Sequence, residues 1–132
     1  MSKVVTISEA ASIAMHGMII IARANKVTNV LEIADATLTS KHHVAKVLQR
    51  LVKEGFLTSQ RGPTGGFILK KDPKKINLLS IYESIEGKIE ITNCFLDKQI
   101  CPFSMCFMNN ITLDLTVKFK EYMETQTLDK YI

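Results

Sequence analysis

Three cysteines in the C-terminal half of the chain carry its most distinctive chemistry. Cys94, Cys101 and Cys106 are separated by six and four residues. An odd number of cysteines argues against a disulfide framework and leaves thiol, metal or redox chemistry. The gaps lack the two-residue spacing favoured by structural zinc, whereas a Cys-Pro step such as Cys101-Pro102 occurs in some loops that bind iron–sulfur clusters. The spacing therefore favours a non-zinc cluster, with three thiols simply packed in a loop as the alternative.

Basic side chains are the second informative group. Between Lys41 and Lys75 the chain has nine Lys or Arg residues and two acidic residues, whereas the rest has eight basic and eleven acidic residues. A basic region between acidic ends is typical of a surface that binds a polyanion, because neutralised phosphates release counterions. By charge alone, a solvated lysine-rich surface fits equally well. The secondary-structure elements that carry these basic residues distinguish a polyanion-binding surface from a merely solvated one.

The N-terminal half of this basic region falls on a predicted helix-turn-helix. Asn29 and Glu32 have capping-box spacing and open a short helix. A turn at residues 37–38 precedes a second helix, which Thr39 or Ser40 caps. In such motifs the second helix lies in the major groove of DNA. The residues predicted to contact DNA from here are Thr39, Ser40, Lys41, His42, His43, Lys46, Gln49 and Arg50.

The first turn of that second helix is expected to lie nearest the bases. Lys41, His42 and His43 are in this turn, whereas Gln49 and Arg50 are expected to meet phosphates. An ordinary exposed amphipathic helix is the alternative. It is disfavoured because the caps, the turn and the following hairpin agree independently.

A glycine-rich hairpin follows the helix. Two strand-like runs, at residues 56–60 and 67–69, are joined by six residues that include one arginine, one proline and three glycines. The three glycines (Gly62, Gly65 and Gly66) permit positive φ angles and close approach to a phosphate backbone, and the proline stiffens the tip. This wing is expected to deliver its arginine into a minor groove. The predicted wing contacts are Arg61, Gly62, Pro63 and Gly65.

Three further helices are predicted on either side of these elements. Residues 8–24 form an apolar-rich buried helix, residues 77–87 a helix between an Asn cap and a Gly stop, and residues 109–126 a final helix. The final helix carries an apolar stripe of Ile111, Leu115, Phe119, Tyr122 and Met123.

Several classes of protein are disfavoured. The longest apolar run, residues 18–22, is far shorter than a membrane span, and the N-terminus lacks the layout of a secretory signal. We therefore expect a cytoplasmic protein without a membrane partner. A thiol-based enzyme or a metal-transfer protein is disfavoured because no CxxC motif, Ser-His-Asp set or phosphate loop accompanies the cysteines. The chain is expected not to be an enzyme.

Several of these motifs, in this order, resemble those of one known family. They are residues 39–44 at the start of the second helix, the wing segments 61–63 and 65–67, the exit 85–87 and then the three cysteines. Together they resemble the Rrf-two family of winged helix-turn-helix transcription regulators over nearly the whole chain. The resemblance implies a homodimer whose long C-terminal helices cross and which binds a partly palindromic double-stranded DNA operator.

The expected fold is mainly α with a small β-hairpin wing: a winged helix-turn-helix domain plus a long C-terminal dimerisation helix. Residues 1–87 are expected to form the DNA-binding domain. Residues 88–108 form the cysteine-containing sensor loop, and residues 109–132 form the dimerisation helix and tail.

The resemblance also implies a ligand set for the cluster. In cluster-binding members, three cysteines of this loop hold a two-iron (2Fe–2S) or four-iron (4Fe–4S) cluster, although with gaps that differ from those found here. Some members supply a histidine after the third cysteine, where this chain has Asn109. Others use an acidic residue near the start of the partner subunit's first helix. Glu9 is the expected fourth ligand on that basis, and His16 is the alternative.

The predicted function is that of a DNA-binding transcriptional regulator, a repressor, that senses redox state, nitric oxide or iron–sulfur status through this cluster. The alternative is a cluster-free regulator of the same fold, controlled by thiol oxidation or by a partner protein.

Overall fold

The computed structural model describes residues 1–91 and 101–132. Within these residues the structure is mainly helical, with one two-stranded antiparallel sheet. This confirms the predicted fold class. In chain order the elements are α1 (Glu9–Ala24), α2 (Val30–Thr37), α3 (Lys41–Lys53), β1 (Leu57–Gln60), β2 (Gly66–Leu69), the 3-10 helix η1 (Pro73–Lys75), α4 (Leu78–Glu86), α5 (Ile111–Thr125) and the 3-10 helix η2 (Leu128–Tyr131).

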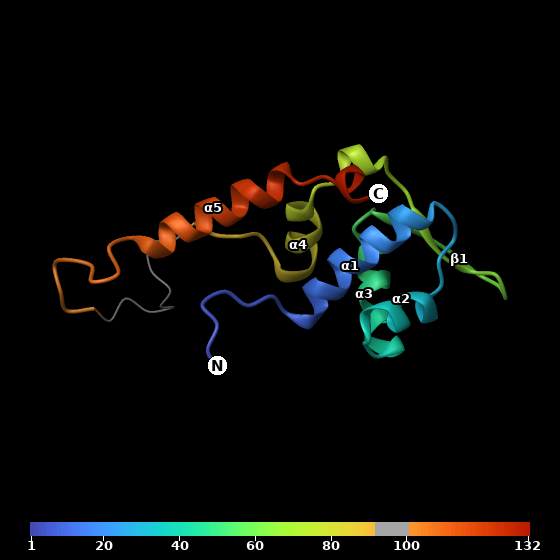
Figure 1. Ribbon diagram of the computed structural model, residues 1–132, viewed down its shortest axis with the longest axis horizontal. Coiled ribbons are helices and arrows are strands. Elements are labelled where there is room, and N and C mark those ends of the chain that lie inside the picture. The colour runs from blue at the N-terminus through green and yellow to red at the C-terminus, as the bar shows by residue number, and fades with distance from the viewer. Residues whose placement is uncertain (92–100) are drawn as a thin grey trace.

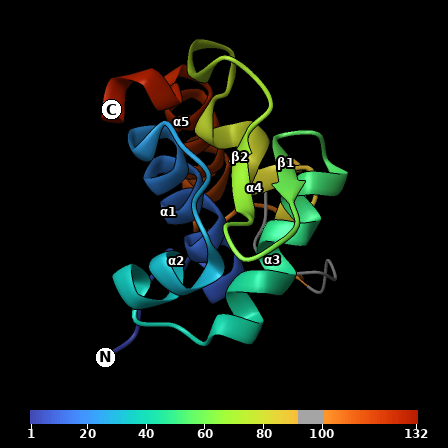
Figure 2. The ribbon, with the colours of Figure 1, turned by 90° about the vertical axis from the view of Figure 1, so that its right-hand side faces the viewer.

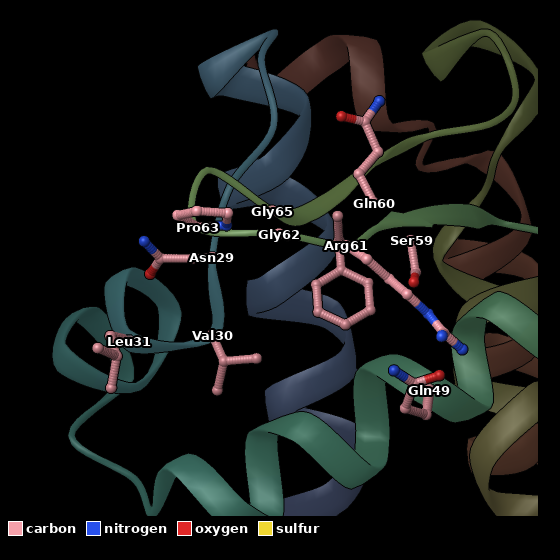
Figure 3. A pocket seen from close by; sticks show the side chains of 12 residues that line it. Asn29, Val30, Leu31, Gln49, Ser59, Gln60, Arg61, Gly62, Pro63 and Gly65 are labelled. Atoms are coloured by element: carbon pink, nitrogen blue, oxygen red, sulfur yellow. The ribbon is translucent and has the colours of Figure 1, made fainter.

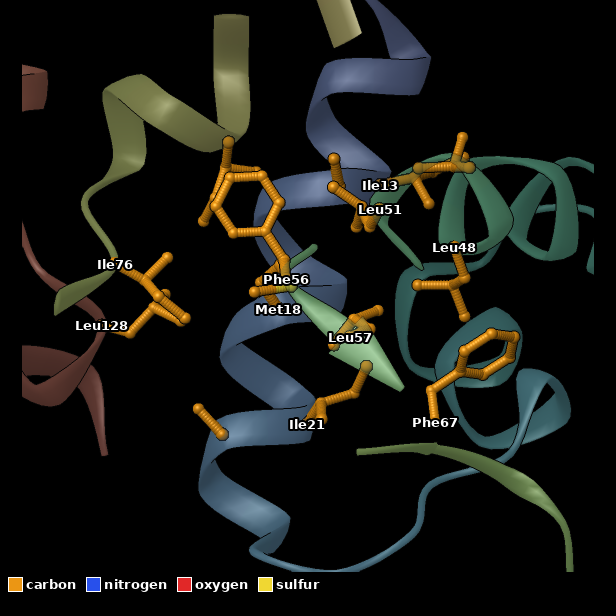
Figure 4. Close-up of a cluster of buried hydrophobic side chains, with 14 of the residues drawn as sticks. Ile13, Met18, Ile21, Leu48, Leu51, Phe56, Leu57, Phe67, Ile76 and Leu128 are labelled. Atoms are coloured by element: carbon orange, nitrogen blue, oxygen red, sulfur yellow. The ribbon is translucent and has the colours of Figure 1, made fainter. Parts of the chain in front are cut away.

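Helix α1 lies at the centre of the packed body. It contacts α2, α3, α4, β2 and η2, whereas α5 packs on α4 and extends away from the body at the end opposite the hairpin (Figure 1). The core forms where apolar faces of these elements meet, as Figure 4 shows. Its fully buried side chains include Ile13, Met18, Ile21, Ile33, Leu48, Leu51, Leu57, Ile76, Ile81 and Leu128.

Polar side chains cap the helices where the sequence predicts. The side-chain oxygens of Ser8, Asn29, Ser40 and Asn77 each accept a backbone N–H in the first turn of α1, α2, α3 and α4. Each cap satisfies one of the amide groups that a helix start leaves without an intrahelical partner. Of the two predicted caps for α3, the structure selects Ser40.

The hairpin packs against α3, and Figure 2 shows β1 and β2 side by side in front of it. The strands pair from Leu57 opposite Leu69 to Gln60 opposite Gly66. Phe67 forms an additional antiparallel bridge with Thr28, which is buried just before α2. The wing is therefore hydrogen-bonded to the start of the helix-turn-helix as well as to itself.

The C-terminal tail returns to the core. Leu128 is fully buried, its N–H donates to the carbonyl of Ile76, and the N–H of Leu78 donates to the carbonyl of Gln126. Only part of the predicted apolar stripe of α5 is buried. Met123 is buried, and Phe119 meets Tyr82 edge to face, whereas Ile111, Leu115 and Tyr122 are exposed. Across residues 1–91 and 101–132, the structure has no helix with the length and apolarity needed to cross a membrane.

Candidate nucleic-acid interface

We call residues 29–69 (α2, α3 and the wing) the reading head. Helix α3 buries Val44, Val47, Leu48 and Leu51 and turns its other side to solvent. Because these apolar residues recur at helical spacing, the charged residues between them are forced outward. Of the predicted contact residues on this helix, Lys41, His42, Lys46, Gln49 and Arg50 are exposed.

A groove of about 570 Å³ opens between the start of α2, α3 and the tip of the wing. It is lined by residues at the start of α2, by Gln49 of α3 and by the wing tip, and Figure 3 shows Gln49 and Arg61 extending toward one another across it. The structure thus brings together Gln49 and the four predicted wing residues Arg61, Gly62, Pro63 and Gly65. Lys41, His42 and Lys46 do not line this groove and are presented separately, along the exposed side of α3.

The hydroxyl groups of Thr39 and Ser40, at the start of α3, differ in whether they can still donate a hydrogen bond to DNA. Thr37 Oγ1 donates its proton to the carbonyl of Ile33 at 2.8 Å, so in its 2.6 Å contact with Thr39 the Thr39 hydroxyl is the donor. Thr39 is thereby committed to the turn. Ser40 Oγ accepts from the His42 amide at 3.2 Å and keeps its own proton available for a phosphate oxygen.

His43 contacts the first helix. Its Nδ1 lies 2.7 Å from Glu9 Oε1, with the two side chains about one-third and two-thirds exposed. The pair joins the start of α1 to the start of α3, which are 34 residues apart. A predicted DNA contact and a predicted cluster ligand therefore touch each other. Sequence reasoning missed this contact because no local pattern links the two positions.

Two other predicted residues also have intramolecular partners. Arg50 Nε donates to Glu54 Oε1 at 3.1 Å one helical turn away, an exposed pair of small energetic weight. His16 Nδ1 lies 2.8 Å from the backbone carbonyl of Ser12, to which it donates.

Of the three wing glycines, Gly62 has the predicted conformation, whereas Gly65 and Gly66 have roles that differ from the predicted ones. Gly62 has the expected positive φ, of 107°. Gly65 does not, and that part of the prediction is wrong: a Cβ there would lie 2.3 Å from the carbonyl oxygen of Gln60, so the turn itself excludes a side chain. At Gly66 a Cβ would lie 2.4 Å from the carbonyl oxygen of Thr28. The close approach that Gly66 permits is to the protein's own backbone.

We call residues 88–110 the cysteine segment. Cys94 lies outside the described residues, so its predicted part in a ligand set is not placed. Cys101 and Cys106 are free thiols, and all of residues 101–110 are exposed. Backbone N–H groups, that of Asn110 first and then that of Met108, lower the pKa of the Cys106 thiol. Among residues 1–91 and 101–132, no three His, Cys, Asp or Glu side chains come together as metal ligands.

Ser8 connects the base of this segment to α1. Its hydroxyl donates to Glu86 Oε1 at the end of α4, while its oxygen accepts the amide of Ala11 at 3.1 Å. The start of α1 thus contacts both α3, through Glu9, and α4, the helix that leads into the cysteine segment, through Ser8.

Two capped helices joined by a tight turn, an exposed basic second helix and a two-stranded wing define a winged helix-turn-helix protein. A family model, Rrf2, described as an iron-dependent transcriptional regulator, matches residues 7–132. The chain belongs to this family, the Rrf-two family that its sequence resembles, and it is a transcriptional regulator.

Individual relatives agree with this assignment. The HTH-type transcriptional regulator NsrR of Bacillus subtilis is 29% identical over 108 residues, which make up 80% of this chain and 74% of that protein. IscR of Pectobacterium atrosepticum is 23% identical over 101 residues, or 76% of this chain and 62% of that protein. The solved structure of CymR (YrzC), the global cysteine regulator of B. subtilis, has the same fold, with a TM-score of 0.78 and 23% identity over 95% of this chain and 94% of that chain.

Proposed function

We propose that this regulator is a repressor that reads its operator with α3 in a major groove and with Arg61 in the neighbouring minor groove. The observation that carries this proposal is the groove between α3 and the wing, across which Gln49 and Arg61 face each other. The exposed cations of α3 lie outside this groove, along the exposed side of the helix, and supply attraction for phosphates there. Residues 1–87 act as the DNA-binding part in this proposal.

Charge reversal tests this interface. A duplex is first selected by the wild-type chain from a random-sequence pool, and its affinity is measured by fluorescence anisotropy. Lys41→Glu combined with Arg61→Glu is expected to weaken binding by about 100-fold or more near physiological salt, because cation contacts become repulsions. Lys3→Glu with Lys88→Glu makes the same change in net charge at exposed sites outside the reading head. Equal losses for the two double variants would contradict the proposal.

A second copy of the chain completes the assembly in this proposal, with α5 as the dimerisation helix in residues 109–132. Ile111, Leu115 and Tyr122 leave an apolar strip exposed on α5 in the single chain. A two-fold contact between α5 helices would remove that strip from water. Leu115→Glu is expected to shift the mass measured by light scattering from dimer to monomer, and an unchanged dimer would exclude this contact.

The sensor in this proposal is an iron–sulfur cluster held by Cys94, Cys101 and Cys106, within the loop at residues 88–108. Thiolates are the ligands that such clusters require, and the lowered pKa of Cys106 favours that form. The description of the family as iron-dependent supports the same choice. Glu9 of the partner copy is the fourth ligand we propose, with His16 as the alternative. Such a cluster would supply sensitivity to redox state, nitric oxide or iron–sulfur supply.

Analysis of anaerobically purified protein tests the sensor. We expect iron and inorganic sulfide in comparable amounts, with a visible absorption band. Cys101→Ser is expected to lose both, whereas Ser104→Ala, a change within the same segment that leaves all three cysteines in place, keeps them. Colourless wild-type protein without iron would remove the cluster from the proposal and leave the DNA interface intact.

A cluster-free regulator is the second candidate, and one observation favours it. Cys106 is exposed and its pKa is lowered, which are the properties of a thiol that oxidants attack. A triple variant with all three cysteines changed to Ser would then bind the selected duplex with wild-type affinity and lose only its response to peroxide.

A further inference from the structure

Leu38, in the turn between α2 and α3, has an unusual conformation. Its φ of 54° and ψ of 42° place it in the left-handed helical region, and its side chain is 92% exposed. Left-handed backbone crowds the Cβ of any residue other than glycine, and an exposed leucine gains nothing from the hydrophobic effect. Within the single chain, both features are unfavourable at this position.

The conformation is nevertheless fixed by hydrogen bonds. The amides of Leu38 and Thr39 both donate to the carbonyl of Ala34 at the end of α2, the second of them at 3.1 Å. The hydroxyls of Thr37 and Thr39, the residues on either side of Leu38, are also hydrogen-bonded to each other, at 2.6 Å. The direction in which the Leu38 side chain leaves the turn is therefore set before any partner binds.

The position points to DNA rather than to a second copy of the chain. Leu38 lies two residues before Ser40, the cap of α3, and three residues before Lys41, the first of the cations that this helix exposes. Both ribbon views place the turn between α2 and α3 away from α5, whose apolar strip is the proposed dimer contact (Figures 1 and 2). In the major groove the C5-methyl of thymine is the apolar group that an alkyl side chain can contact.

We propose that Leu38 is a specificity-determining residue that contacts the C5-methyl group of one thymine in the operator. This inference rests on the proposed function, because it requires the start of α3 to enter the major groove. The fixed turn lowers the entropy lost when the contact forms, and the contact buries a side chain that is otherwise in water. The strained leucine is then a feature of binding and not of folding.

A thymine-to-uracil scan of the selected duplex tests the contact, since uracil lacks only the methyl group. At one position, or at its symmetry-related pair, uracil is expected to weaken wild-type binding by about fourfold per methyl. Leu38→Asn suits the left-handed backbone and removes the apolar end, so it should bind the thymine duplex more weakly and be insensitive to uracil at that position. Leu38→Met keeps an alkyl side chain and should retain the uracil effect.

Thermal unfolding provides the second readout. Leu38→Asn and Leu38→Gly are expected to unfold at the wild-type temperature or above it, because both tolerate the backbone conformation. If the wild-type chain binds the duplex tightly but no uracil substitution weakens the binding, the role of Leu38 is overturned and the proposed function stands. An uracil effect that persists in Leu38→Asn would overturn it too. If the wild-type chain retains no duplex at all, the proposed function itself fails.

Discussion

The reading head and the cysteine segment are held in very different ways. In the reading head, Asn29 and Ser40 cap their helices, Leu48 and Leu51 are fully buried, and the wing is bridged to Thr28. In residues 101–110 every side chain is exposed, including Phe103, Met105 and Phe107. The first region has its shape without a ligand, whereas residues 101–110 of the second gain no shape from packing on the core.

In the proposed function, this contrast divides the signal, received at the cysteine segment, from the response, made by the reading head. A surface that reads DNA benefits from rigidity, because ordering it on binding would reduce affinity. A segment whose conformation depends on what its thiols bind can report on that chemistry. The start of α1 lies between the two, since Ser8 contacts Glu86 and Glu9 contacts His43.

The largest expected difference between the two regions comes from replacing one large apolar side chain in each of them with alanine. Leu48→Ala is expected to lower the free energy of unfolding by about 2–5 kcal/mol, because it opens a cavity in the core. Phe107→Ala in cluster-free protein should change it by less than about 0.5 kcal/mol, since that ring is 76% exposed. Urea denaturation at one fixed protein concentration measures both. Similar losses would show that the cysteine segment is packed after all.

A smaller difference in stability is expected when one serine hydroxyl is removed from each region. Ser40→Ala should lower the free energy of unfolding by about 1 kcal/mol, because the first turn of α3 loses the acceptor for the His42 amide. Ser104→Ala, an exposed serine in the cysteine segment, is the matched control and should have no measurable effect. A loss of stability in Ser104→Ala but not in Ser40→Ala would contradict this prediction.

The thiol of Cys106 can be tested by its rate of alkylation. In a Cys94→Ser, Cys101→Ser variant, iodoacetamide should react at half its maximal rate at a lower pH in the folded chain than in urea. The sign follows from the pKa of Cys106, which backbone N–H groups lower by stabilising the thiolate. Coincident pH profiles would mean that these N–H groups do not point at the sulfur in solution.

The smallest expected effect concerns the pair that links α1 to the reading head. Glu9→Gln should lower the free energy of unfolding by less than about 1 kcal/mol, because the pair with His43 is exposed to water. A double-mutant cycle with His43→Gln isolates the contact. A coupling energy well above this range would contradict the expectation and make the pair a main support of α3.

Most of the reading head could be predicted from the sequence because its determinants are local. A cap depends on an oxygen two or three residues from the amide that it accepts, so Asn29 and Asn77 could be recognised from spacing, and the cap of α3 could be narrowed to Thr39 or Ser40. The buried face of α3 follows from helical periodicity. The cysteines could be recognised as a candidate ligand set by residue type, and the family by its order of motifs.

Contacts between distant segments were decided only by the tertiary structure. The sequence contains no signal that Glu9 meets His43, that Leu128 is buried against Ile76, or that Gly66 lies against the backbone of Thr28. Periodicity identified the apolar residues of α5, but packing on α4 determined which of them are buried. The physical reason is that short-range hydrogen bonds and helical spacing are properties of neighbouring residues, whereas burial depends on which surfaces the folded chain brings together.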